Sequence, residues 1–133
     1  MTTAEQNVEL ARRVYEALDQ HDGDGYLGLM DEDVVIESAL AAVEGGYQGH
    51  DGVRRWWDDF VSAFPDYTME IEEVRPIGTD RTLARLYGSA RSAAGAAPVS
   101  DPFWHVMTWR DGRCTRWRTC GSEAEALEVL GRS

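Results

Sequence analysis

Apolar side chains recur every three or four residues in two segments of the chain, which is the spacing of an amphipathic helix. The first segment covers residues 5–20 and places on one face Val8, Ala11, Val14, Tyr15 and Leu18. The second begins at His50 or Asp51 and is stopped by Pro65. Its apolar positions are Val53, Trp56, Trp57, Phe60, Val61 and Phe64. The pattern therefore predicts two long helices, each with one buried face.

A short helix is predicted between these two. Gly23 is suited to the left-handed residue that ends the first helix, and Asp24 to the N-cap of the next one, which contains Tyr26. Residues 33–38 are rich in β-branched side chains and predict a strand. Residues 39–49 predict a loop with a brief strand near Tyr47.

The rest of the chain predicts an antiparallel sheet. Its four strands are expected at residues 67–77, 82–91, 102–110 and 113–120. The segment 78–80 is a turn signal, and Asp111-Gly112 is typical of a two-residue hairpin turn. Ser122 is expected to cap a last helix, residues 123–130, which packs on the sheet through Ala126, Leu127 and Leu130.

This order of elements predicts an α+β fold in a single domain, residues 1–133 with a core at about 5–131. We expect a cone in which helices pack on a strongly curved, mostly antiparallel sheet. The space enclosed by such a sheet is filled by aromatic side chains or by a ligand.

Charge narrows the range of partners. The chain has 24 acidic residues against 13 basic ones, a formal net charge of −11. A surface this negative repels phosphate backbones and anionic lipids, so we expect neither nucleic acid nor a membrane as partner. All basic residues are arginines. Without lysine, Schiff-base chemistry, a pyridoxal-phosphate site and a phosphate-loop lysine are excluded, and we expect no cofactor.

The cysteines and the first residues indicate a cytoplasmic protein. Cys114 and Cys120 lie about 20 Å apart on one predicted strand, beyond the reach of a disulfide, and predict reduced, buried thiols. No metal-ligand spacing is present, so no metal site is expected. The first seven residues lack the basic and apolar regions of a signal peptide, and no segment has the ~18 apolar residues of a membrane span.

Five segments together resemble a known family: residues 9–18, 49–53, 64–66, 105–112 and 125–127. In this combination the chain resembles the SnoaL-like branch of the nuclear-transport-factor-2-like superfamily. The resemblance implies the cone-shaped fold over nearly the whole chain. It implies no single activity, because this superfamily contains cyclases, isomerases, hydrolases and non-catalytic domains.

Two enzyme groups within that superfamily can be compared by position. The pocket histidine of SnoaL-type polyketide cyclases falls on His105, whereas their catalytic aspartate falls on Thr119, which cannot exchange a proton near pH 7. The carboxylate base and the two oxyanion donors of ketosteroid isomerase fall on Ser38, Val14 and Trp104. Tyr15 lies one residue from the required position. The isomerase constellation is therefore absent.

The resemblance makes His105 the candidate acid/base of a cofactor-independent enzyme, with Glu37 or a bound water as its partner. The substrate would be a small apolar molecule, cyclic or polyketide-like. The side chains expected to shape its cavity are Tyr15, Trp57, Phe60, Tyr87, Trp104, Met107 and Thr119. The alternatives are a buried His105 that only satisfies a hydrogen bond, and a Glu37 solvated at the end of its strand. The protein would then be a non-catalytic ligand-binding or scaffold domain.

The hairpin turn constrains the geometry of this candidate site. A regular two-residue turn at Asp111-Gly112 places His105 opposite Arg118, so that His105 and Thr119 face opposite sides of the sheet. The resemblance requires both to point inward. We therefore predict a β-bulge in one of the two strands.

The tryptophans of these strands suggest an assembly. Any of Trp104, Trp109 and Trp117 that faces away from the helices would add to a large apolar sheet surface. Such a surface is better buried than exposed. The sequence therefore predicts a homodimer through the sheet face, with Arg116 and Arg118 at its rim.

Overall fold

The computed structural model describes residues 4–37, 47–63, 68–89 and 102–131. Within these ranges it has an α+β architecture, as predicted. The elements in chain order are α1 (Ala4–Asp19), α2 (Gly23–Gly28), β1 (Met30–Glu37), β2 (Tyr47–Gln48), α3 (Gly49–Ala63), β3 (Thr68–Ile77), β4 (Arg81–Ser89), β5 (Pro102–Arg110), β6 (Arg113–Cys120) and α4 (Glu123–Gly131).

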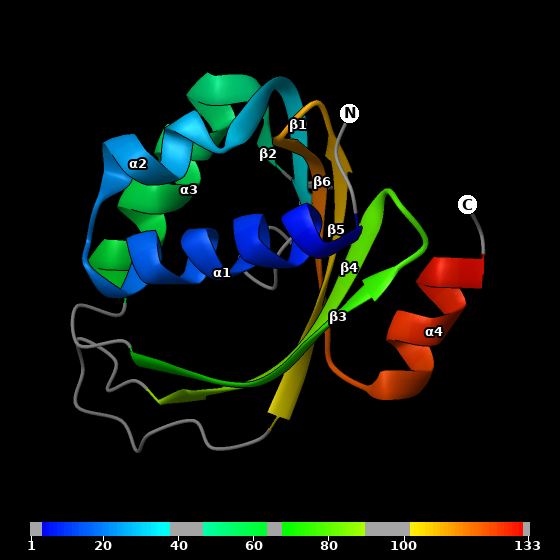
Figure 1. Cartoon of the computed structure of the whole chain (residues 1–133). Coiled ribbons are helices and arrows are strands. Elements are labelled where there is room, and N and C mark those ends of the chain that lie inside the picture. Colours follow the sequence, from blue (N-terminus) through cyan, green and yellow to red (C-terminus); the bar gives the residue numbers. More distant parts are fainter. Residues whose placement is uncertain (1–3, 38–46, 64–67, 90–101, 132–133) are drawn as a thin grey trace.

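A single curled sheet has helices on both of its sides. The strand order is β2-β1-β6-β5-β4-β3, with β1 parallel to β6 and the other described pairs antiparallel. The helices α1, α2 and α3 lie on the concave side, and α4 lies on the opposite side (Figure 1). We call these two sides the inner face and the outer face of the sheet. Since strand side chains alternate between faces, each strand contributes to two different layers.

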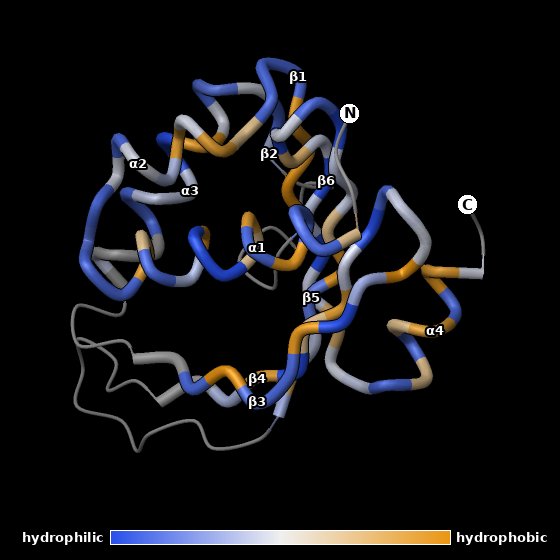
Figure 2. The backbone as a smooth tube through the Cα atoms, viewed as in Figure 1, coloured by the Kyte–Doolittle hydropathy of each residue, from blue (hydrophilic) through white to orange (hydrophobic). Residues whose placement is uncertain are grey.

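The inner face forms the main hydrophobic core together with α1, α2 and α3 (Figure 2). Its buried strand residues include Val34, Ile36, Ala84, Leu86, Met107, Trp109, Cys114 and Trp117. The outer face has a smaller core, in which Leu83, Val106 and Cys120 pack with Ala126 of α4. Both cysteines are free and buried, as predicted, and they lie on opposite faces.

The predicted bulge is present in β6. Arg110 pairs with Arg113 and Trp109 with Cys114, but Thr108 pairs with Arg116, so that Thr115 is an extra residue. The hairpin turn itself has the left-handed backbone expected of it, with φ of 52° at Asp111 and 79° at Gly112. Beyond the bulge His105 lies opposite Thr119.

The boundaries around α2 differ from the prediction. The left-handed residue after α1 is His21, with φ of 55°, and not Gly23, which begins α2. Asp22 replaces Asp24 as the N-cap, and its Oδ1 accepts a hydrogen bond from the Gly25 backbone N–H at 3.0 Å. Met30 is the first residue of β1. At the last helix Ser122 Oγ accepts from the Glu125 N–H at 3.1 Å, which confirms the predicted cap.

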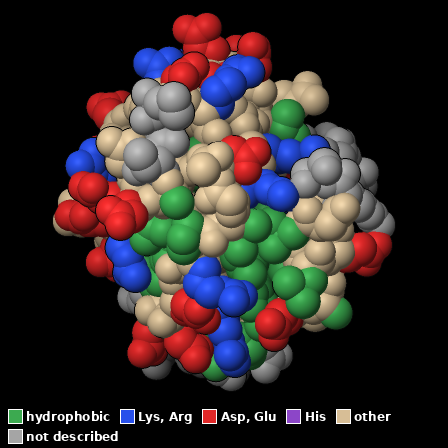
Figure 3. Space-filling model, turned by 45° about the vertical axis from the view of Figure 1, so that its right-hand side comes forward, with side chains coloured by type: hydrophobic (Ala, Val, Ile, Leu, Met, Phe, Trp, Pro, Cys, Tyr) green, Lys and Arg blue, Asp and Glu red, His purple; other side chains and the backbone are tan. Residues whose placement is uncertain are grey.

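The last helix covers less of the sheet than its sequence suggests. Ala126 is fully buried and Leu130 is half-buried against the outer face, but Leu127 is 52% exposed. Trp109 and Trp117 both point to the inner face, so of the three tryptophans only Trp104 lies on the outer one. Figure 3, with the α4 side turned forward, shows hydrophobic side chains separated by arginines and acidic residues. The outer surface is therefore mixed, and not the broad apolar face that the three tryptophans predict.

A buried asparagine ties α1 to the distant β3–β4 turn. Asn7 is fully buried, and its Nδ2 donates a hydrogen bond to the Thr79 carbonyl oxygen at 2.8 Å. We expect Asn7→Ala to lower the free energy of unfolding by about 1–1.5 kcal/mol, because the bond is lost while the exposed turn can still be hydrated. Urea unfolding of the variant measures this difference. An unchanged unfolding midpoint would show that the bond does not stabilise the fold.

In the four described ranges no helix is both long enough and apolar enough to cross a membrane.

Candidate binding site around His105

His105 lies on the inner face in the middle of β5, between Ala84 of β4 and Thr119 of β6. Its side chain is 4% exposed. The ring nitrogen Nδ1 lies 2.9 Å from the Tyr15 hydroxyl oxygen, which comes from α1 across the core. This hydrogen bond joins two groups that are 90 residues apart in the sequence.

Aromatic side chains surround the imidazole of His105. The Tyr15 ring lies almost parallel to it, with centroids 5.7 Å apart. The rings of Phe103 and Trp117 are steeply inclined to it, with centroids 5.2 Å and 4.9 Å away. Phe103 precedes His105 by two residues and Trp117 precedes Thr119 by two, so the strand period places all four on one face. Sequence reasoning missed Phe103 and Trp117 as walls of the site, although counting by two would have found them.

Burial sets the protonation state of this histidine. Transfer of the imidazole out of water lowers the pKa of His105 from 6.5 to about 3, since the charged form loses its hydration. The ring is therefore neutral near pH 7. A neutral imidazole has one N–H and one lone pair. When the Tyr15 hydroxyl donates to Nδ1, the ring hydrogen is on Nε2 and can be donated to another group.

The site is less tightly covered at one end. Phe103 and Thr119 are half-buried, whereas His105 and Met107 further along the strands are buried. Within the described part of the chain the Thr119 hydroxyl makes no hydrogen bond. The inner face beside His105 therefore has a free polar group and incomplete cover on the side where β5 begins and β6 ends.

Four of the predicted cavity residues lie on the concave side of the sheet. Tyr15 contacts His105, and Met107 and Thr119 are its neighbours on the inner face. Trp57 is more remote: its ring lies 5.4 Å from Tyr26, and it lines a groove of about 270 Å³ between α2 and α3. The side chain of Phe60 lies outside the described part of the structure.

Glu37 is not the partner of His105. In the parallel pairing of β1 with β6 it lies beside Arg118, which places its side chain on the outer face. There it forms ion pairs with Arg116 and, at 3.4 Å, with Arg118. The predicted acid/base pair is therefore wrong, because the sheet separates its two members.

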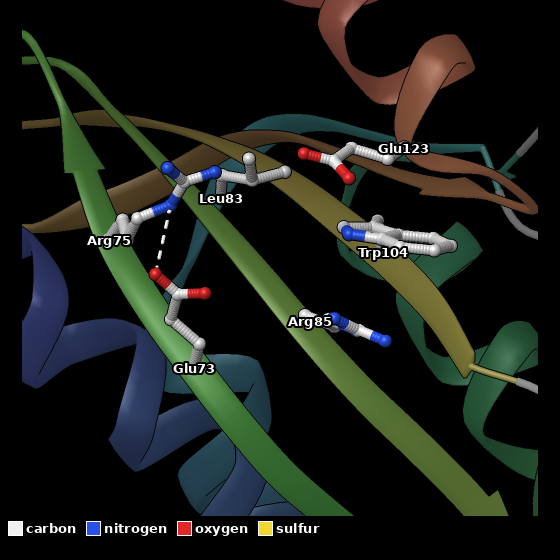
Figure 4. Close-up of a pocket in the computed structure, with 6 residues that line it drawn as sticks. All are labelled: Glu73, Arg75, Leu83, Arg85, Trp104 and Glu123. Carbon is white, nitrogen blue, oxygen red and sulfur yellow. Dashed lines mark ion pairs between the residues drawn. The ribbon is translucent and has the colours of Figure 1, made fainter.

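Trp104 and Tyr87 also lie on the outer face, contrary to their predicted role in the cavity. Trp104 is adjacent to His105 and so points the other way, while Arg85, its cross-strand neighbour, places its guanidinium 5.7 Å from the indole ring. The same arginine donates to the Tyr87 hydroxyl at 3.4 Å. Figure 4 shows Trp104 and Arg85 in a small polar hollow of about 50 Å³ together with Glu73 and Glu123.

Among the described residues no group of three potential metal ligands comes together, so the donor set of His105 does not resemble a metal site. The Tyr15 hydroxyl is hydrogen-bonded to the ring, and Thr119 is the cross-strand neighbour of His105 on β6. Their hydroxyl groups and the neutral imidazole suit hydrogen bonding to an uncharged molecule.

A family model described as a SnoaL-like domain matches residues 11–117. A sequence search of curated proteins gave no match. Solved structures do match, at identities that bear on the fold alone.

Three of these structures cover most of both chains. TerC, co-crystallised with polyporic acid, is 22% identical, with a TM-score of 0.77 over 95% of this chain and 98% of that one. An NTF2-like protein of unknown function from Burkholderia pseudomallei is 20% identical, with a TM-score of 0.78 over 94% and 97%. A protein with a ketosteroid isomerase-like fold from Catenulispora acidiphila, in complex with trimethylamine, is 14% identical, with a TM-score of 0.75 over 92% of each chain.

Proposed function

This chain belongs to the SnoaL-like domain family, and we propose that it binds a small, apolar, ring-containing molecule against the inner face of its sheet. The observation that carries the proposal is the buried hydrogen bond between Tyr15 and His105 within a set of aromatic rings. Aromatic walls favour a flat apolar ligand, and the few polar groups among them fix its orientation. TerC, which has the same fold, was co-crystallised with a small organic molecule, polyporic acid.

The neutral state of His105 favours binding over proton transfer. A general base works best when its pKa is near the working pH, and the pKa of His105 is about 3. The neutral ring can still donate a hydrogen bond from Nε2 to an oxygen of the ligand. Binding without conversion is therefore the function that the site supports best.

Acid/base catalysis of the cyclase, isomerase or hydrolase type is the second candidate. It is favoured by the position of His105, where the resemblance to polyketide cyclases places the pocket histidine. The contact with the Tyr15 hydroxyl supplies a route for a proton. It requires that the bound substrate raise the pKa of His105, because Glu37 lies on the other face and Thr119 does not titrate near pH 7.

Two matched threonine variants test the proposed site. Thr119→Leu adds bulk on the inner face beside His105, whereas Thr108→Leu makes the same change on the outer face. Binding of the probes tetralin and 1-tetralone is measured by titrations followed by NMR. We expect Thr119→Leu to weaken their binding about tenfold, because the larger leucine side chain would clash with the bound probe. Thr108→Leu should leave binding unchanged. Equal effects of the two variants, or no binding by the wild type, would refute the proposed site.

The same samples separate the two candidates. After prolonged incubation, chromatography of the probes and of a wider panel of one- to three-ring compounds reports any conversion. Recovery of every compound unchanged supports a binding protein. Product formation that the variant His105→Gln abolishes would instead make this protein an enzyme.

We also propose that two copies of the chain pair through the outer face. Support comes from the exposed Leu127 of α4 and from Trp104, which is only half-buried there. Sedimentation equilibrium should give twice the chain mass of 14.9 kDa. We expect Leu127→Arg to weaken the association, since a charge would be buried in the contact. A wild type that sediments as a monomer at micromolar concentration would contradict this proposal.

A further inference from the structure

A hollow of about 230 Å³ lies on the outer face of the sheet, beside the C-terminal part of α4. The side chains that line it include three of the chain's 13 arginines and two valines: Arg81, Arg116, Arg118, Val106 and Val129. The site around His105 lies on the other face of the sheet. The hollow is therefore a second, separate place at which a ligand can bind.

Arg81 is fixed in place, but its charge is weakly compensated. Its Nη1 donates a hydrogen bond to the Leu130 carbonyl oxygen of α4 at 2.9 Å, and its side chain is only 18% exposed. Its Nε is buried and makes no hydrogen bond to a described residue, since the Asp80 carboxylate oxygen is 3.9 Å away. A guanidinium that is mostly out of water has lost hydration that an acceptor must replace. An anionic ligand beside Arg81 would supply that acceptor.

Carboxylates accompany the other two arginines but bind only part of their N–H groups. Glu37 accepts a hydrogen bond from Arg116 Nε at 3.0 Å. The ion pairs of Arg118 are longer, 3.4 Å from Nη1 to Glu37 and 3.9 Å from Nη2 to Glu125. Each guanidinium has five N–H groups. Arg81 and Arg118 therefore keep N–H groups that can donate to a further acceptor.

The rest of the hollow limits what the anion can be. Val106 is 4% exposed, and Val129 and Thr108 are half-buried, so apolar surface lines the same hollow as the N–H donors. A planar carboxylate matches the fork of N–H groups on a guanidinium. The volume is below the ~300 Å³ at which pockets for drug-sized ligands begin, which favours a single ring or a short branched chain.

We propose that this hollow binds a small organic carboxylate. The carboxylate group lies between Arg81 and Arg118, and the apolar part of the ligand packs on Val106 and Val129. The inference does not rest on the function proposed for the inner face, because the sheet separates the two sites.

Three ligands of one shape test the charge of the bound group. Benzoate, benzamide and benzamidine share a ring and a planar head group but are negative, neutral and positive near pH 7. In NMR titrations followed through the backbone amides of Thr108 and Val129, we expect benzoate to bind at least tenfold more tightly than benzamide, and benzamidine not at all. Acetate, which has no ring, should bind about tenfold more weakly than benzoate. Equal affinities for benzoate and benzamide would overturn the inference.

Arginine variants test which residues recognise the ligand. We expect Arg118→Gln and Arg81→Gln each to weaken benzoate binding about tenfold, because a charge-assisted hydrogen bond is lost. Arg118→Gln keeps the test valid if Arg81→Gln loosens α4 by removing the bond to Leu130. Arg75→Gln is the matched control, since Arg75 lies on the same face but lines the other hollow. An equal loss in Arg75→Gln would show that only the overall charge matters, and would refute the site.

The two threonine variants separate this inference from the proposed function. Thr108→Leu fills the hollow and should weaken benzoate binding about tenfold, whereas Thr119→Leu should leave it unchanged. This order is the reverse of that expected for tetralin. Binding of benzoate without binding of tetralin or 1-tetralone would mean that the proposed function alone fails. Binding of tetralin without binding of benzoate would mean that the inference alone fails.

The second source of a carboxylate is an acidic side chain of another copy of the chain, because pairing through the outer face is proposed above. Sedimentation equilibrium with and without saturating benzoate distinguishes the two sources. We expect the same mass in both samples. A fall to the mass of one chain when benzoate is added would show that a second copy fills the hollow, and would overturn the inference of a small-molecule site.

Discussion

Replacing Trp56 by alanine is expected to lower the free energy of unfolding by about 3–5 kcal/mol, the cost of truncating a fully packed aromatic side chain. Trp56 is 4% exposed and belongs to the ring cluster around Tyr26 that joins α3 to the sheet. Its ring stacks on Tyr26 at 5.5 Å and meets Trp117 at 5.0 Å. Truncation removes these contacts and leaves a cavity that the curved sheet cannot close. Urea unfolding followed by far-UV circular dichroism measures the loss.

The neighbouring tryptophan provides the control for this prediction. Trp57 is on the same helix and contacts Tyr26 as well, but it is half-buried and lines the open groove between α2 and α3. We expect Trp57→Ala to cost less than half as much as Trp56→Ala, because part of its ring is already hydrated. Equal losses at the two positions would mean that Trp57, at the groove, is packed as tightly as Trp56.

The second large effect is a loss of stability in mild acid caused by His105. Its pKa is about 3 in the folded chain and near 6.5 in the unfolded one, so the unfolded state binds the extra proton between these values. The contribution of this group is therefore complete above pH 7 and decreases as the pH falls. Between pH 7 and pH 5 we expect a loss of about 2 kcal/mol from His105 alone.

His105→Gln isolates this contribution, because glutamine keeps a polar side chain but takes up no proton. Urea unfolding at a series of pH values should show the two proteins converging in stability as the pH decreases from 7 to 5. Curves that stay parallel over this interval would mean that His105 takes up its proton in the folded protein as readily as in the unfolded one. Water would then reach the ring, and the case for acid/base catalysis would become stronger.

Helical and strand periodicity accounts for most of the fold. The apolar stripe that contains Val14 predicts α1, and the one that contains Trp56 predicts α3. The turn at Asp111-Gly112 predicts the β5–β6 hairpin. The segment between α1 and β1 is predicted less well, because His21 has a left-handed backbone and residue propensities do not predict this conformation for histidine.

The errors at the site have a different origin. His105, Met107 and Thr119 share a face, as the resemblance and the bulge require. Trp104 and Glu37 are predicted as site residues from their type, because an aromatic ring and a carboxylate suit a pocket. Each is adjacent in the chain to a residue that points inward, Trp104 to His105 and Glu37 to Ile36, and so points outward. Because side chains alternate along a strand, the position of a residue in the strand determines which face it occupies, whatever its type. The pairing of β1 with β6 joins segments that are far apart in the sequence, and no local pattern predicts it.

The extra residue at Thr115 has a consequence for comparing this chain with its relatives. Between the turn and Thr119, β6 has one residue more than the β5 segment that it faces. A relative without this bulge would have one residue fewer in β6, and an ungapped alignment anchored on the turn would match its inward side chains to outward ones here. Transfer of residue roles across the family therefore requires that the gap be placed at the bulge. Counting from the turn alone would assign the partner of His105 to Arg118, on the wrong side of the sheet.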